Sequence, residues 1–178
     1  RQSIGWLGDL ARDVGGDRAI AESFQYRIAT NADCAAVEKL VFDVLAEYGL
    51  APEPEGVDVD LRDLEGAYFE RGGWFGVWLD EDGAIIGSAG LCRVNDSTCE
   101  LRKMYYLPEA RGRGLGERML RMCLDRAREL GFRRCYLETL TGMDAAMNLY
   151  ERLGFRKLCG PIGNTGHFSC DRQYLLEL

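Results

Sequence analysis

The sequence predicts an α+β fold, with a mixed, mostly antiparallel sheet flanked by helices. Residues 74–79 and 84–92 are apolar runs joined by a turn with Asp82 and Gly83 at its tip, which is the pattern of a β-hairpin. A third strand follows and alternates bulky and polar residues until Pro108, which cannot donate a hydrogen bond to a strand ladder. Segments with apolar residues at helical spacing precede and follow these strands. Antiparallel strands in succession, with helices around them in the chain, indicate this fold class.

Before the hairpin, the chain carries the signals of a strand and a helix. Residues 25–29 are a predicted strand, and Thr30 with Asp33 forms a capping-box pattern for a helix that ends at Gly49. The buried face of this helix is expected to comprise Ala36, Leu40, Val41, Val44, Leu45 and Tyr48. A second helical stripe is expected within residues 51–70.

The second half of the chain predicts two helices and three further strands. One helix ends at Gly131, and the other is expected to be capped by Thr141 and Asp144 and to run to Leu153. The strands are expected at residues 134–139, 155–158 and 173–178. The whole pattern predicts a single domain at residues 25–178, after a glycine-rich N-terminal extension at residues 1–24. The sequence leaves open whether this extension docks on another subunit, as in a homodimer.

Composition bears on the partners of the chain. The net charge of -7 argues against nucleic-acid binding, which needs basic surface, and suits a cationic or amine substrate, although it also serves solubility alone. No apolar run is long enough to span a bilayer, so no membrane partner is expected. The seven cysteines include no Cys-x-x-Cys pair and predict free thiols in a reducing, cytoplasmic setting. His167 and Cys170 are too few ligands for a closed zinc site, so no metal is expected.

A glycine-rich loop follows the third strand and opens a helix. Gly112, Gly114 and Gly116 alternate with other residues, and apolar positions then recur at helical spacing from Leu115. A strand, a glycine loop and a helix in this order direct backbone N–H groups and the positive end of the helix dipole toward one spot, which suits a phosphate or pyrophosphate. The spacing differs from the Rossmann fingerprint, and no Gly-Lys-Ser/Thr follows.

The pattern Arg111-x-x-Gly114-x-Gly116 resembles the coenzyme loop of the GNAT N-acyltransferase superfamily. Two further features agree with it in order and spacing. Glu100 lies eleven residues before Arg111, and residues 149–155 are similar to the family's Leu-Tyr-x-x-x-Gly-Phe signature, with Tyr150 as its tyrosine. The resemblance implies acetyl-CoA as cosubstrate, a sheet whose central strands splay apart, and coenzyme contacts from Met104, Tyr105, Tyr106, Arg111, Gly112, Arg113, Gly114, Leu115 and Gly116. One position departs from the family, since Met143 replaces an asparagine that contacts the pantetheine arm.

The resemblance also implies roles in catalysis. Glu100 is the candidate base, because a carboxylate can take a proton from an ammonium group directly or through a water. From the sequence alone, Glu100 is equally well explained as a strand glutamate that faces solvent. Tyr150 is implied to be the acid that protonates the leaving thiolate, although it also fits an ordinary helix aromatic. A backbone N–H near Met104 is implied to polarise the thioester carbonyl.

These observations predict an N-acetyltransferase that moves acetyl from acetyl-CoA to a primary amine of a small molecule. A protein lysine or N-terminus as acceptor, and a non-catalytic sensor that only binds acyl-CoA, are the alternatives. The acceptor wall is expected from the acidic residues 51–70 and from the loop at residues 160–166. The acidic stretch either attracts an amine or is a solvated helix face.

Overall fold

The structure, a computed structural model, describes residues 24–162 and 170–178 and contains one mixed sheet of seven strands in the order β1-β2-β3-β4-β5-β7-β6. The expected N-terminal extension up to residue 23, His167 and most of the expected acceptor loop lie outside the described residues. The strands are β1 (Gln25–Ile28), β2 (Trp74–Leu79), β3 (Ile85–Arg93), β4 (Thr98–Tyr106), β5 (Arg134–Thr139), β6 (Arg156–Lys157) and β7 (Arg172–Glu177). Among these described strands, β4 and β5 form the one parallel pair. The predicted α+β fold is confirmed.

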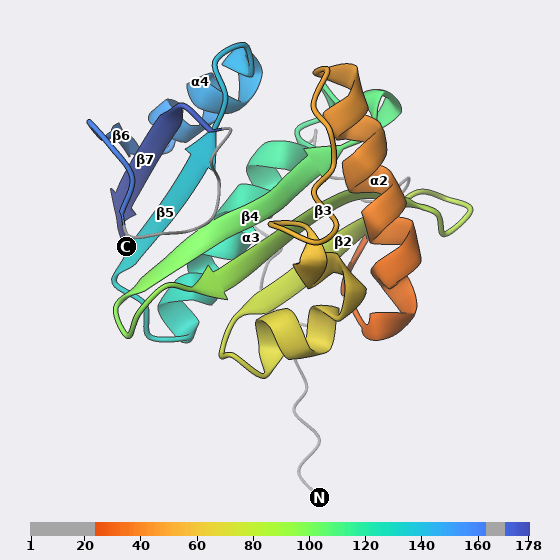
Figure 1. Cartoon of the computed structure of the whole chain (residues 1–178), viewed down its shortest axis with the longest axis horizontal. Coiled ribbons are helices and arrows are strands. Elements are labelled where there is room, and N and C mark those ends of the chain that lie inside the picture. Colours follow the sequence, from red (N-terminus) through yellow and green to blue (C-terminus); the bar gives the residue numbers. More distant parts are fainter. Residues whose placement is uncertain (1–23, 163–169) are drawn as a thin grey trace, which may run out of the picture.

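Helices cover both faces of the sheet (Figure 1). They are α2 (Cys34–Glu47), α3 (Leu115–Glu129) and α4 (Asp144–Arg152). Alternate residues of β2 point to opposite faces, as the pleat of a strand requires. Trp74 and Trp78 pack in the core with α3 and with Tyr150 of α4, whereas Phe75 and Val77 pack in the core with α2. The sheet therefore separates two hydrophobic cores.

Most local predictions for the first helix hold, with a shift of its buried face. The strand β1 and the helix α2 lie where they were predicted, and Leu40, Val41, Val44 and Leu45 are buried. Ala36 is exposed and Val37 takes its place in the core, while Tyr48 is 46% exposed. The stripe from Val37 to Leu45 keeps the spacing of one helix face, and Ala36 falls about 100° away from Val37.

The acidic residues 51–70 form short turns in place of a regular helix. They contain a 3₁₀ turn, η2 (Val59–Arg62), and a π-helical turn, η3 (Glu65–Phe69). Side chains bind the backbone here: Asp58 accepts the N–H of Glu53, Asp63 accepts that of Gly66, and Asn31 accepts that of Glu65. Such bonds compete with a helical ladder. The apolar stripe still packs, with Leu61, Leu64 and Tyr68 fully buried.

The prediction that Thr141 caps α4 is wrong. Both the N–H and the hydroxyl of Thr141 donate to the carboxylate of Asp171, at 2.7 and 2.6 Å, so Thr141 ties the β5–α4 loop to the loop before β7. Met143 holds the N-cap position and Asp144 lies in the first turn. A carboxylate in the first turn is favoured by the helix dipole.

Asp33 is expected to stabilise the fold in a pH-dependent way. It accepts the N–H of Thr30 at 2.9 Å and forms a bidentate pair with Arg27 at 2.7 Å, and this pairing with Arg27 lowers the pKa of the Asp33 carboxyl. Asp33→Asn should lower the free energy of unfolding by about 1–2 kcal/mol at neutral pH. Because the folded pKa lies below the unfolded value of about 3.9, this loss should disappear as the pH falls through the folded pKa.

Urea titrations of both proteins between neutral and acidic pH measure the effect. Asp43→Asn is the matched control, because Asp43 pairs with Lys39 on an exposed face of α2 and should contribute little. A stability difference for Asp33→Asn that does not depend on pH would contradict the assignment.

Candidate active site

The central strands separate where the resemblance implies that they should. β4 and β5 pair from Thr98 with Arg134 up to Leu101 with Leu137, and both strands continue beyond this point without pairing. The register between β3 and β4 also shifts, since Gly90 pairs with Arg102 and Ser88 with Tyr105. Two residues of β4, Lys103 and Met104, therefore lie opposite Ala89 alone, which is a β-bulge.

Two cavities meet at the split between β4 and β5. The inner cavity has a volume of about 270 Å³ and is lined by β4, β5 and the segment 50–58. The loop groove has a volume of about 500 Å³ and is lined by the end of β4, the glycine loop and the start of α4. The residues that line both cavities are Met104, Tyr105, Met143, Ala146 and Tyr150. The groove and the inner cavity therefore adjoin each other at Met104 and Tyr150.

The glycine loop presents backbone donors to the loop groove. Gly112 and Gly114 have φ values of 71° and 77°, a conformation that glycine adopts without strain. Within the described part of the chain, the N–H groups of residues 112–117 have no protein acceptor; the next donor along, Arg118, bonds to the carbonyl of Gly114. Unpaired N–H groups at the N-terminus of a 15-residue helix suit an anion.

The two arginines of the loop lie in different surroundings. The guanidinium of Arg111 binds both carboxylate oxygens of Glu47 on α2, at 2.7 and 3.1 Å, and its Nε donates to the carbonyl of Tyr106 at 2.9 Å. This pairing raises the pKa of Arg111. Arg111 therefore anchors the loop to α2 and β4 and also lines the groove. Arg113 lies with its guanidinium over the ring of Phe24, 5.3 Å from its centroid.

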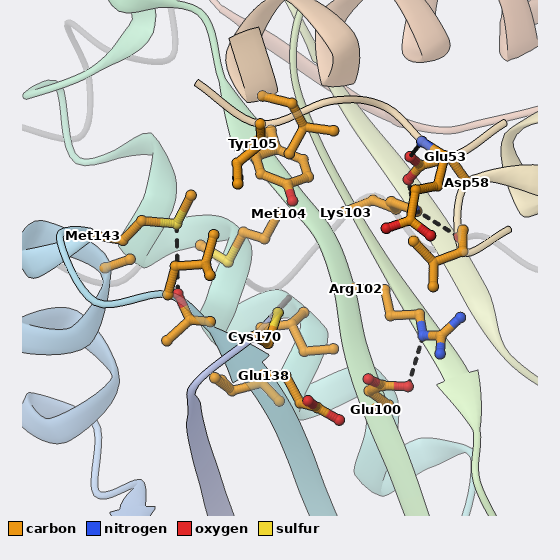
Figure 2. A pocket seen from close by; sticks show the side chains of 18 of the residues that line it. Glu53, Asp58, Glu100, Arg102, Lys103, Met104, Tyr105, Glu138, Met143 and Cys170 are labelled. Carbon is orange, nitrogen blue, oxygen red and sulfur yellow. Dashed lines mark hydrogen bonds and ion pairs between the residues drawn. The ribbon is translucent and has the colours of Figure 1, made fainter. Parts of the chain in front are cut away.

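Glu100 lies in the inner cavity, which Figure 2 shows from close by. Its side chain is 2% exposed, and its Oε2 accepts the Nε–H of Arg102 at 2.6 Å. Burial acts to lower the pKa of Arg102, but the Glu100 carboxylate and the other neighbours of Arg102 together raise it. Glu138 enters the same cavity from β5, and Cys170 lies between the two strands (Figure 2). Burial raises the pKa of the Cys170 thiol to about 12, so this thiol stays protonated at neutral pH.

Tyr150 stands where the two cavities join. Its ring packs against Phe155 and Tyr174, with centroid distances of 5.8 and 6.1 Å, and its side chain is almost fully buried. Burial raises its pKa, so the phenol keeps its proton at neutral pH. Met143, at the family's asparagine position, also lines both cavities and accepts the hydroxyl of Thr139 at 3.5 Å through its sulfur. Asn148, two residues before Tyr150, is exposed on another side of α4.

Sequence reasoning missed the polar wall around Lys103. The side chain of Lys103 is 4% exposed and is paired with Asp58 and Asp60, so two acids of the segment 51–70 are counter-ions of β4. Both acids therefore pair with Lys103 and do not form a solvated helix face. The signal was present in the sequence: an arginine and a lysine follow Glu100 in a strand that is otherwise apolar, and buried cations need carboxylate partners.

Known proteins share this sequence and fold. Residues 39–155 match the family model described as "Acetyltransferase (GNAT) family". The chain is 38% identical to the Escherichia coli protein named N-acetyltransferase YjgM over 157 residues, which cover 85% of this chain and 93% of the relative. It is 29% identical to an N-acetyltransferase of Schizosaccharomyces pombe, C1271.07c, over 66% of this chain and 72% of that protein.

Solved structures agree with the fold. A GNAT-family acetyltransferase from Staphylococcus aureus superposes with a TM-score of 0.77 at 18% identity, covering 86% of this chain and 98% of that one. The Salmonella typhimurium protein yncA, solved with its cofactor acetyl-CoA, superposes with a TM-score of 0.66 at 24% identity, covering 86% and 93%. With the splayed strands, the glycine loop and these relatives in agreement, the chain belongs to the GNAT acetyltransferase family and is an acyltransferase that requires an acceptor substrate.

Proposed function

We propose that this enzyme moves acetyl from acetyl-CoA to a primary amine of a small molecule. The observation that carries the proposal is the junction of the two cavities at Met104 and Tyr150, with the buried carboxylate of Glu100 in the inner one. The loop groove is the coenzyme side and the inner cavity is the acceptor side.

The loop groove fits a diphosphate and the arm that follows it. The N–H groups of residues 112–117 donate to the phosphates, and the helix dipole of α3 adds to their attraction. Tyr105 and Tyr106 line the path from the loop toward the split. Tyr106 also donates its hydroxyl to the carbonyl of Leu115 at 3.4 Å, which ties the end of β4 to the start of α3. The bound coenzyme supplies an acetyl thioester, whose carbonyl carbon is the electrophile.

Three groups of this chain serve the reaction at the junction. Glu100 takes a proton from the acceptor ammonium, directly or through a water. The backbone N–H of Met104, in the bulge, donates to the carbonyl oxygen as negative charge develops there. The Oη of Tyr150, protonated because burial raises its pKa, gives a proton to the departing sulfur.

The inner cavity supports a small, cationic acceptor. Four carboxylates, from Glu53, Asp58, Glu100 and Glu138, line it against two cations, Arg102 and Lys103. An excess of negative charge in a cavity favours a positively charged ligand. A volume of about 270 Å³ admits a small molecule more readily than a folded protein surface.

A panel of amines tests the proposal through release of the free thiol and the mass of the product. The panel contains cadaverine, tyramine, an α-amino acid and a peptide with an internal lysine, each with acetyl-CoA. Amine-stimulated thiol release with a free amine indicates the proposed class, and release with the peptide alone indicates a protein acceptor. Binding of acetyl-CoA without stimulated release by any amine would leave the non-catalytic sensor.

Gly114, one of the two left-handed glycines of the loop, offers a test of the coenzyme side. Gly114→Ala places a side chain on a backbone with φ of 77°, which costs about 1–2 kcal/mol unless the loop shifts. A shift turns the phosphate-binding N–H groups away, so the KM for acetyl-CoA should rise about tenfold, which corresponds to about 1.4 kcal/mol of lost binding. Steady-state kinetics with varied acetyl-CoA measure it.

Gly131→Ala is the matched control for this variant. Gly131 follows the end of α3 with a φ of 86° and open space where a β-carbon would lie, and it lines neither cavity. Both variants should therefore lose similar thermal stability, while only Gly114→Ala should change the KM for acetyl-CoA. Equal KM values in the two variants would argue against the loop as the diphosphate site.

A further inference from the structure

Lys103 adopts a backbone conformation that normally requires glycine. Its φ is 52°, and among the described residues it is the one residue other than glycine with a positive φ. It occupies the first position of the bulge opposite Ala89, where glycine avoids the contact between a β-carbon and the backbone. Such strain persists only where the surroundings hold it in place, and it is common at functional sites.

The side chain of Lys103 explains why a lysine stands there. Its Nζ donates to the carbonyl of Val57 at 3.0 Å and pairs with Asp58, and it lies 3.4 Å from Asp60. Asp58 in turn accepts the N–H of Glu53 at 2.8 Å. Figure 2 shows Lys103, Asp58 and Glu53 next to one another at the wall of the inner cavity. One residue of β4 thus fastens a segment that precedes it by some 45 positions.

The backbone of Lys103 is held from its other side. Ser88, fully buried on β3, donates its hydroxyl to the carbonyl of Lys103 at 2.7 Å. This carbonyl and the N–H of Met104 belong to the same planar peptide, so fixing one fixes the direction of the other. Ser88 therefore sets the orientation of the N–H that is proposed to polarise the thioester carbonyl.

We propose that Lys103 is a positioning residue that couples the acceptor wall to the donor at the bulge. Its side chain clamps residues 53–60 over the inner cavity, and its backbone, with Ser88, aims the Met104 N–H. The clamp sets the acceptor KM, and the aimed peptide sets kcat. This assignment rests on the proposed function, in which the inner cavity holds the acceptor.

Three variants separate the two effects. Lys103→Gly keeps the left-handed backbone but removes the clamp, so the acceptor KM should rise about tenfold or more with a smaller change in kcat. Ser88→Ala releases the peptide but keeps the clamp, so kcat should fall about tenfold or more with the acceptor KM little changed. Neither should change the KM for acetyl-CoA. Lys39→Met, at an exposed lysine that pairs with Asp43, is the control and should change nothing.

The kinetics use the panel amine with the highest kcat/KM as the acceptor. Because Lys103→Gly leaves Asp58 buried without its cation, Lys103→Gly with Asp58→Asn is measured as well, and it should keep the raised KM while regaining thermal stability. If Lys103 only stabilised the fold, the loss of activity in each variant would follow its melting temperature, and the changes in KM and kcat would not separate between variants. That result would overturn the proposal.

Hydrogen exchange tests the clamp without any substrate. In the Lys103→Gly variants, the amides of residues 53–62 should exchange faster while those of α3 stay protected. Unchanged exchange in residues 53–62 would overturn the clamp. If no amine of the panel is acetylated, the proposed function fails, whereas the exchange experiment still decides whether Lys103 holds this wall.

Discussion

Replacing Glu100 with glutamine is expected to lower kcat by about 10² to 10⁴, the range in which a positioned general base contributes. Glutamine keeps the size of the side chain and its place on β4 but cannot accept a proton. An acceptor ammonium must then lose its proton to bulk water before it can attack. Thiol release at saturating acetyl-CoA and amine measures the change.

The loss is expected to depend on pH in a defined direction. An alkyl amine has a pKa of about 10.4, so its uncharged fraction rises about tenfold with each pH unit below that value. The variant depends on this fraction, whereas the parent enzyme deprotonates the ammonium inside the cavity. The ratio of parent to variant activity should therefore be largest at low pH and shrink as the pH rises. An unchanged ratio across the pH range would remove Glu100 from the mechanism.

Glu138→Gln is the matched control for Glu100→Gln. Glu138 lines the same cavity from β5, so the control removes the same charge at nearly the same place. It should keep most of the turnover and the pH profile of the parent enzyme. Arg102 lies 4.0 Å from Asp60 and so keeps one acidic neighbour when Glu100 is changed, which should preserve the fold. Equal losses in both variants would indicate that the charge of the cavity matters and that no single base does.

The elements that sequence predicted well are those that local signals determine. The hairpin of β2 and β3, the end of β4 before Pro108 and the start of α3 after the glycine loop each follow from turn, proline and glycine chemistry within a few residues. The splayed strands required the resemblance, because the pairing of β4 with β5 joins segments more than 30 residues apart. No local sequence pattern predicts the residue at which such a pairing between strands ends.

The parts that sequence missed depend on contacts between distant segments. Residues 51–70 have apolar residues at helical spacing, yet the segment does not form a regular helix. Its Asp58 and Asp60 instead pair with Lys103 of β4. A positive φ at Lys103 contradicts its own backbone preference and is stable only because of those partners. Thr141 likewise has the form of a helix cap but binds Asp171 some 30 residues later. In each case a tertiary partner outweighs a local preference.

Replacing Tyr150 with phenylalanine is expected to lower kcat by about 10² while the KM for acetyl-CoA stays nearly unchanged. Phenylalanine keeps the ring that packs against Phe155 and Tyr174, so only the Oη at the junction of the cavities is lost. The departing sulfur must then take its proton from water. Turnover and acetyl-CoA binding, measured by thiol release and calorimetry, separate the two effects.

The deficit of Tyr150→Phe should also shrink at high pH. A thiol has a pKa of about 8.5, so above that pH the released sulfur is stable as a thiolate and gains little from an acid. Tyr174→Phe is the control, because its neighbouring hydroxyl donates to Glu151 at 3.0 Å and lines neither cavity. It should retain the activity of the parent enzyme. Full activity in Tyr150→Phe would show that solvent supplies the proton, and a raised KM with unchanged kcat would make Tyr150 a wall of the coenzyme groove alone.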